Sequence, residues 1–217
     1  MKATNSRHGD TSKRSMDIQM DSGKFSHEYF SSGTYADYEA YVESWANRVL
    51  RKIHSLTREK KDIKILDVGC AHGYFLAKAK KASFKIGGLE YSNFAIKKAE
   101  VSVRKEIRKG SILERGNFPK NHADVVLCFD VCEYLPEPSI MKAVQNLAHW
   151  TKEYIFFTDI YKHSKWASHT HNPDPNRITT LSQKEYIDIF RMAGVKLYAK
   201  WDGGTGCDIL IFKKLKR

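Results

Sequence analysis

Several features that would narrow the class of this protein are scarce or missing. Only four of its 217 residues are cysteine. Cys70, Cys128, Cys132 and Cys207 form neither a C-x-x-C pair nor a zinc-ligand spacing, which predicts reduced thiols and excludes a disulfide scaffold. No apolar run approaches the roughly 18 to 20 residues of a membrane helix. Residues 1–8 also lack the apolar core of a signal peptide. We therefore expect a cytoplasmic protein that does not span a membrane.

Acidic residues are outnumbered by basic ones, which gives a formal net charge of +12. Much of the excess lies between residues 61 and 109, mostly on predicted helices, whose solvated faces are the usual place for lysine. A basic surface raises the encounter rate with anionic partners, including nucleic acids and phosphorylated or carboxylated metabolites. Because the chain contains no basic and aromatic nucleic-acid motif, we expect a small-molecule partner and keep nucleic acid as the second option.

The most informative stretch is residues 62–76. An apolar run ends on Asp67, Gly69 and Gly73 follow four positions apart, and a helical pattern starts at once. This order predicts a strand, a tight turn and a helix whose N-terminal N–H groups face a ligand. The G-x-G-x-x-G spacing of a dinucleotide site is missing. Asp67, at the carboxyl end of the strand, would repel a pyrophosphate but attract an ammonium or a sulfonium.

This segment resembles motif I of the class I S-adenosylmethionine-dependent methyltransferases, which reads hhDhGCGxGxh, where h is an apolar residue. Ala71 stands where that family usually has a glycine. The resemblance implies S-adenosyl-L-methionine as the cofactor, held around Asp67, Gly69, Cys70, Ala71 and Gly73. An ordinary buried strand followed by a glycine turn is the alternative interpretation of this segment alone.

A second apolar run, residues 84–92, contains Glu90 about twenty residues past the glycine turn, the distance typical of a ribose-binding acid. A carboxylate there is placed to accept hydrogen bonds from both hydroxyls of a ribose, although a surface glutamate is the alternative. Tyr91 would pack beside the ribose or the adenine. The resemblance places Ser111 at the adenine amino group, where the family commonly has an aspartate, and Ile112 against a face of the base.

Residues 124–138 resemble the motif that follows the fourth strand in this family, which often reads D-x-V-x-x-x-x-V-L-E-H-h-x-x-P. The matching positions are Asp124, Val131, Glu133 and Pro138. Tyr134 replaces the usual histidine. The resemblance implies that Phe129 and Asp130 border the methionine end of the cofactor and that Tyr134 faces the substrate.

The chain divides into three predicted parts. Residues 1–24 are polar and aperiodic, and we expect a disordered tail. In residues 25–60, apolar residues recur at helical spacing at Tyr38, Val42, Trp45, Val49 and Ile53, which predicts a helix, and the resemblance implies that this segment is an N-terminal helical lid. Residues 61–217 form the cofactor-binding domain, with residues 161–180 as an insertion. The resemblance implies an α/β fold with a Rossmann-like, doubly wound, seven-stranded sheet that is mostly parallel and has one antiparallel strand.

The insertion supplies candidates for the acceptor side, because loops of this length in a compact domain are usually functional. We assign four residues to acceptor binding, namely Tyr35, Tyr134, Trp166 and Arg177. If the acceptor must lose a proton, the candidate bases are His171, then His169 and His163, with Asp159 and Glu133 in reserve. The three histidines fit no familiar metal site, so no metal is expected.

These features favour an enzyme that methylates an oxygen or nitrogen atom of a small, anionic or sugar-containing metabolite. An RNA or protein methyltransferase is the second hypothesis, and its substrate affinity would fall steeply with salt. The third is a non-catalytic domain that binds the cofactor or pairs with a catalytic subunit. It would bind S-adenosylmethionine without transferring a methyl group.

Overall fold

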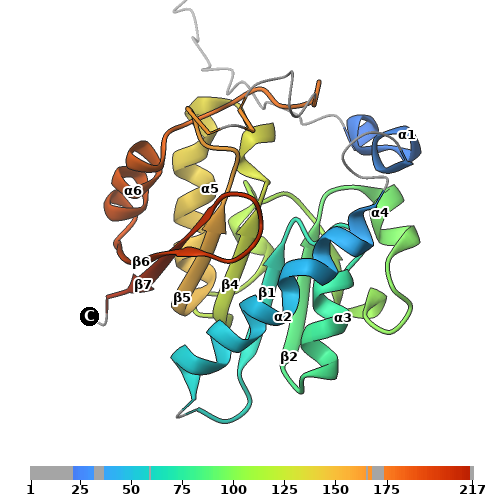
Figure 1. The fold of residues 1–217 in the computed structure, drawn as a ribbon, viewed down its shortest axis with the longest axis horizontal. Helices are drawn as coiled ribbons and strands as arrows, with labels where there is room; N and C mark the ends of the chain where they lie inside the picture. The colour runs from blue at the N-terminus through green and yellow to red at the C-terminus, as the bar shows by residue number, and fades with distance from the viewer. Residues whose placement is uncertain (1–21, 32–36, 59, 165, 168–173, 216–217) are drawn as a thin grey trace, which may run out of the picture.

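A seven-stranded sheet forms the centre of the computed structural model, which describes residues 22–31, 37–58, 60–164, 166–167 and 174–215 (Figure 1). The strands are β1 (Lys64–Val68), β2 (Lys85–Glu90), β3 (Ile107–Lys109), β4 (Ala123–Phe129), β5 (Thr151–Thr158), β6 (Val195–Asp202) and β7 (Asp208–Lys214). Their order is β3-β2-β1-β4-β5-β7-β6. β7 is antiparallel to both neighbours, and the pairs from β3 to β5 are parallel. The predicted sheet is therefore confirmed.

Helices cover both faces of this sheet. They are α1 (His27–Ser31), α2 (Tyr38–Thr57), α3 (Tyr74–Lys81), α4 (Asn93–Lys98), α5 (Glu137–Trp150) and α6 (Gln183–Met192), with short 3-10 turns at Ser22–Phe25, Arg104–Glu106, Arg115–Asn117 and Cys132–Tyr134. α2 and α3 pack on one face with Ile65 of β1, and α5 and α6 pack on the other with Leu66. Successive side chains of a strand point to opposite faces, so both faces of β1 are buried.

The predicted N-terminal helix is confirmed as α2. Val42, Trp45, Val49 and Ile53 are all buried, and they form the stripe that packs on the sheet. The helix pattern therefore fixed both the element and its buried face. None of the described helices is long and apolar enough to cross a membrane.

The helix α4 is short. It ends at Lys98, where Ala99 takes an extended backbone. The N–H of Glu100 then donates to the carbonyl of His72 at 2.9 Å. This long-range bond to the glycine turn competes with helix continuation, and no pattern within the helix itself encodes it.

Candidate functional site

The turn after β1 has the backbone geometry that its glycines predict. Gly69 and Gly73 have φ angles of +78° and +73°, and Ala71 between them has φ 46°. A Cβ on Gly69 would collide with the Cγ2 of Val131. The N–H of Gly69 donates to the carbonyl of Leu89 in β2 at 2.8 Å. The turn is therefore tied to the neighbouring strand and leads directly into α3.

Glu90 holds this turn from β2. Its Oε2 accepts the N–H of Ala71 at 2.8 Å, and its Oε1 accepts the N–H of Ser92 at 2.6 Å. The backbone N–H of Tyr91 also stabilises the charged carboxylate, so only part of its acceptor capacity stays available for a ligand. Burial raises the pKa of Glu90, and these backbone donors oppose the rise. The residue thus organises the loop and lines the cleft at the same time.

Asp67 is a buried carboxylate for which the described residues supply neither a hydrogen bond nor an ion pair. Burial, and then the negative charge of Glu90, raise its pKa from 3.8 to about 7. An uncompensated carboxylate in such a place is costly unless a cation joins it. A cation bound beside Asp67 would offset this cost.

A cleft of about 880 Å³, part of it open to solvent, lies at the carboxyl ends of β1, β2 and β4. Eight of the predicted cofactor residues line it, namely Gly69, Ala71, Glu90, Tyr91, Ser111, Ile112, Phe129 and Asp130. Asp67, Cys70 and Gly73 are not among the lining residues. Their individual roles toward a cofactor stay predictions.

Aromatic residues of the N-terminal segment cover this cleft. The cover consists of Phe25, Tyr29, Phe30, Tyr38, Tyr41 and Trp45. The hydroxyl of Ser92 donates to the carbonyl of Phe25 at 2.6 Å and also accepts the N–H of Ala95, so the start of α4 is latched to the cover. This latch joins positions 67 residues apart in the chain, and the sequence contains no signal for it.

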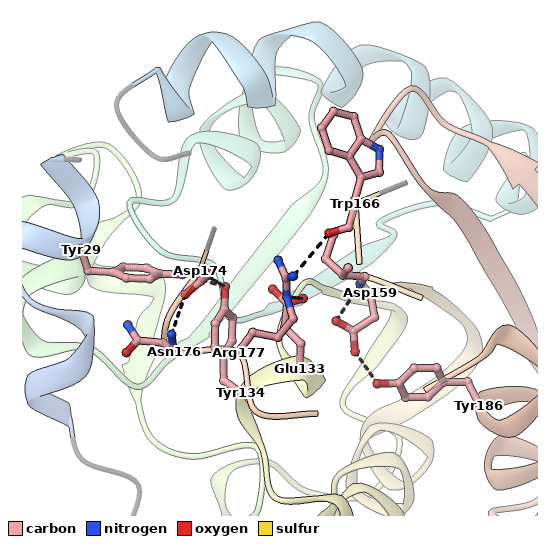
Figure 2. A network of polar contacts seen from close by, with 10 residues as sticks. Tyr29, Glu133, Tyr134, Asp159, Trp166, Asp174, Asn176, Arg177 and Tyr186 are labelled. Carbon is pink, nitrogen blue, oxygen red and sulfur yellow. Dashed lines mark hydrogen bonds and ion pairs between the residues drawn. The ribbon is translucent and has the colours of Figure 1, made fainter. Parts of the chain in front are cut away.

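A second polar cluster lies on the β4 side of the cleft (Figure 2). The hydroxyl of Tyr134 donates to Oδ2 of Asp174 at 2.7 Å and lies 2.7 Å from the hydroxyl of Tyr29. Oδ1 of Asp174 accepts the N–H of Asn176 at 2.9 Å. Tyr29 and Tyr134 line the cleft, whereas Asp174 lies behind them. Sequence analysis assigned Tyr134 to the acceptor but did not single out Asp174.

Arg177 was predicted to contact the acceptor, but its side chain is buried behind the cleft lining. Its Nε donates to Oε2 of Glu133 at 3.0 Å, and both side chains are almost completely buried. Its Nη1 donates to the carbonyl of Trp166 at 3.3 Å (Figure 2). Arg177 thus anchors the insertion to the turn after β4, and it does not line the cleft.

Buried acids surround this ion pair. Burial, and then the charge of Glu133, raise the pKa of Asp130 from 3.8 to about 7, although the charge of Arg177 opposes the rise. Burial also raises the pKa of Glu133 and that of Asp159, whose carboxylate accepts a hydrogen bond from Tyr186. Glu133 and Asp159, the reserve bases, are therefore occupied by protein partners.

The remaining predicted residues lie outside the cleft or outside the described residues. His163 is exposed and has φ 70°, and Trp166 donates from Nε1 to the carbonyl of Gly206 at 3.0 Å. Neither lines the cleft. Tyr35, His169 and His171 lie outside the described residues. The assignment of a histidine base stays a prediction.

The site fits a cationic nucleoside ligand. Glu90 offers an acceptor for ribose hydroxyls, Ile112 and Tyr91 offer apolar surface for a base, and Asp67 has no ion-pair partner among the described residues. In the sequence, the model of the methyltransferase domain family matches residues 38–200. The chain belongs to this family. The cofactor of this methyltransferase domain is S-adenosyl-L-methionine, and the residues above suit its nucleoside and its charge.

This chain is also similar in sequence or structure to known methyltransferases. A ubiquinone biosynthesis O-methyltransferase of Nitrosospira multiformis is 27% identical over 107 residues, which are 46% of this chain and 44% of that protein. The chain thus spans less than half the length of that curated relative. A SAM-dependent methyltransferase of Archaeoglobus fulgidus aligns with TM-score 0.61 and 15% identity over 82% of this chain and 100% of that one. The magnesium protoporphyrin IX methyltransferase of Synechocystis PCC 6803, solved with bound SAH, aligns with TM-score 0.62 and 12% identity. The alignment covers 86% of this chain and 97% of that one.

Glu90→Ala in this methyltransferase domain is expected to weaken binding of S-adenosylhomocysteine by about 1 to 3 kcal/mol, because ribose hydroxyls and two loop N–H groups lose their acceptor. Calorimetric titration measures the change. Glu90→Gln keeps one acceptor oxygen and should give a smaller loss. Glu114→Ala, at an exposed glutamate, is the control. An unchanged dissociation constant for Glu90→Ala would show that the ribose lies elsewhere.

Proposed function

We propose that this protein transfers a methyl group from S-adenosyl-L-methionine to an oxygen or nitrogen atom of a small metabolite. The observation that carries the proposal is the aromatic cover of the cleft, which confines the space beside Phe129, Asp130 and Tyr134. A polymeric substrate needs an open surface, whereas aromatic side chains line much of this cleft. In this proposal residues 25–60 act as a lid and residues 161–180 as the acceptor loop.

The lining narrows the proposed acceptor. Glu90 and Asp130 are the charged side chains among the described lining residues, and both are acids. An anionic group of the acceptor without a cationic partner would be repelled there, whereas a neutral ring with a hydroxyl or amine would stack on the aromatic cover. We therefore place the reacting ring of a sugar-containing or aromatic acceptor in the cleft. The anionic group, predicted from the basic surplus, would face solvent.

Tyr134 and Asp174 provide a route for the acceptor's proton. Bound S-adenosylmethionine supplies an electrophilic methyl group on a positively charged sulfur, which becomes neutral when the methyl group leaves. The acceptor needs only position, desolvation and a place for its proton. In our proposal the acceptor proton moves to the oxygen of Tyr134 while the hydroxyl proton of Tyr134 moves to Asp174. The distance of 2.7 Å between these two side chains supports the second transfer.

Labelled methyl transfer tests the proposal. The protein is incubated with S-adenosylmethionine carrying a labelled methyl group and, separately, with a panel of phenols, sugars and amines, with bulk RNA, and with denatured protein extract. Label is expected in the small-molecule arm. Label confined to RNA, with a rate that falls steeply with salt, would replace this proposal with a nucleic-acid methyltransferase. Tight cofactor binding without transfer in any arm would indicate a non-catalytic subunit.

A further inference from the structure

Trp45 lines the cleft, and its buried indole N–H has no acceptor among the described residues. Trp45 is 5% exposed and lines the cleft. Its ring stacks on Phe75 at 5.5 Å and meets Phe129 edge-on at 5.4 Å. Its Nε1 finds no hydrogen-bond partner within the part of the chain that the structure describes. The ring contacts account for the aromatic side chain, but they leave the polar atom unexplained.

An unpaired buried donor is unusual in a folded protein. Buried indole N–H groups normally find a partner, and leaving one unpaired costs about 1 to 3 kcal/mol. A phenylalanine would fill much of the same apolar space without that cost. The arrangement is therefore explained if a ligand in the cleft supplies the acceptor.

Trp45 lies at the end of the cleft opposite the nucleoside. Glu90 ends β2 and Ser111 follows β3, so the acceptors proposed for ribose and adenine lie on the β2 and β3 side of β1. Phe129 ends β4, the neighbour on the other side of β1, and Trp45 contacts it. A ligand that spans the cleft from Glu90 therefore reaches Trp45 with its far end.

The far end of the cofactor is an amino acid, and its carboxylate needs donors. Neither lysine nor arginine is among the described lining residues, whose charged members are the acids Glu90 and Asp130. A carboxylate there must be held by neutral donors. Trp45 carries such a donor with its hydrogen-bonding capacity unused.

We propose that the Nε1–H of Trp45 donates a hydrogen bond to the carboxylate of the amino-acid end of the cofactor. This inference rests on the assignment of S-adenosylmethionine as the cofactor. A hydrogen bond to a charged acceptor in a buried site is roughly twice as strong as one between neutral groups. Trp45 thus selects ligands that carry the carboxylate over shorter thioether nucleosides that lack it.

The test compares two ligands on two proteins by isothermal titration. S-adenosylhomocysteine carries the carboxylate, and its decarboxylated form differs by that group alone. Trp45→Phe should bind S-adenosylhomocysteine about 10-fold more weakly than the wild type. Its affinity for the decarboxylated form should stay within about 2-fold of the wild-type value, because that ligand never used the N–H. Trp201→Phe is the matched control, since Trp201 packs against the same hydrophobic cluster and does not line the cleft.

A second measurement does not depend on a variant that must fold. The chain has four tryptophans, and their indole N–H signals are resolved after ¹⁵N labelling, with that of Trp45 identified from the Trp45→Phe spectrum. S-adenosylhomocysteine should shift this signal downfield, and the decarboxylated form should not. Equal losses for both ligands in Trp45→Phe, or equal shifts with both, would overturn the inference. If S-adenosylhomocysteine does not bind the wild type, the cofactor assignment fails and the inference with it.

Discussion

Asp67→Asn is expected to make the cofactor-free protein more stable at pH 8 while it weakens cofactor binding by about 10-fold or more. The carboxylate of Asp67 is buried, and its pKa rises from 3.8 to about 7. Above that pH the folded protein must hold an uncompensated charge beside Glu90. Asparagine removes the charge, so the free energy of unfolding should increase by about 1 to 4 kcal/mol. The bound cofactor loses a favourable partner for its positive charge.

The raised pKa of Asp67 determines how the stability difference between Asp67→Asn and the wild type changes with pH. Between pH 4 and pH 7 the folded state retains a proton on Asp67 that the unfolded state has lost, so this carboxyl group lowers stability progressively as the pH rises. Below pH 4 both states are protonated and the effect vanishes. The stability difference between Asp67→Asn and the wild type should therefore grow from pH 4 to pH 7 and stay constant above it. Urea denaturation at pH 5 and pH 8 measures it.

Asp124→Asn is the matched control at the start of the neighbouring strand. Asp124 is also buried, but it accepts the N–H of Lys64 at 3.0 Å and pairs with Lys60 at 3.4 Å. Its pKa is lowered because these partners outweigh burial. Asp124→Asn should therefore destabilise the protein at pH 8. A loss of stability in Asp67→Asn as well would mean that Asp67 has a partner and is not held in reserve for a cation.

The contrast between these two aspartates shows what the sequence can predict. Asp67 and the glycines after it form one short pattern in which strand, turn and helix follow each other, and such local patterns predict structure well. Asp124 was matched by its place in a family motif, and that match does not reveal the partners that lower its pKa. The sheet, α2 and the residues around the turn could therefore be predicted.

The remaining parts of the site depend on contacts between distant residues. Trp45 shares a helical stripe with the core residues Val42, Val49 and Ile53, so its spacing cannot distinguish the cleft from the core. Asp174 meets Tyr134 across 40 positions and Tyr29 across 145. Such pairs form only when the folded sheet brings their loops to one edge. Arg177 was assigned to the acceptor from its place in the insertion, and the sequence contains no signal for its ion pair with Glu133, 44 positions away.

Tyr134→Phe is expected to lower the rate of methyl transfer by about 100-fold or more, once an acceptor has been identified. The replacement keeps the ring that contacts Phe25 edge-on at 5.1 Å and removes the hydroxyl that receives the acceptor proton. Loss of a positioned proton acceptor typically costs about 100-fold to 10,000-fold in rate. The affinity for S-adenosylhomocysteine should stay within about 2-fold, because the cofactor needs no proton transfer.

Two further variants separate proton transfer from packing. Asp174→Asn keeps an acceptor for the hydroxyl of Tyr134 but cannot take up its proton, so it should lose about as much rate as Tyr134→Phe. The double variant should lose little more than either single one, because both residues act on one proton. Tyr29→Phe removes the neighbouring hydroxyl, which lies 2.7 Å from that of Tyr134, and a smaller loss is expected.

The alternative hypothesis, that a histidine of the insertion is the base, predicts the opposite pattern of rate losses among the variants. If a histidine of the insertion is the base, His163→Ala, His169→Ala or His171→Ala should abolish transfer, and Tyr134→Phe should change mainly the KM of the acceptor. The pH profile also discriminates, because a histidine base would make the rate rise near the ordinary histidine pKa of about 6.5. That rise should persist in Tyr134→Phe if a histidine accepts the proton. If Tyr134 and Asp174 carry it, the residual rate in Tyr134→Phe should instead rise with pH as the acceptor itself ionises in solution.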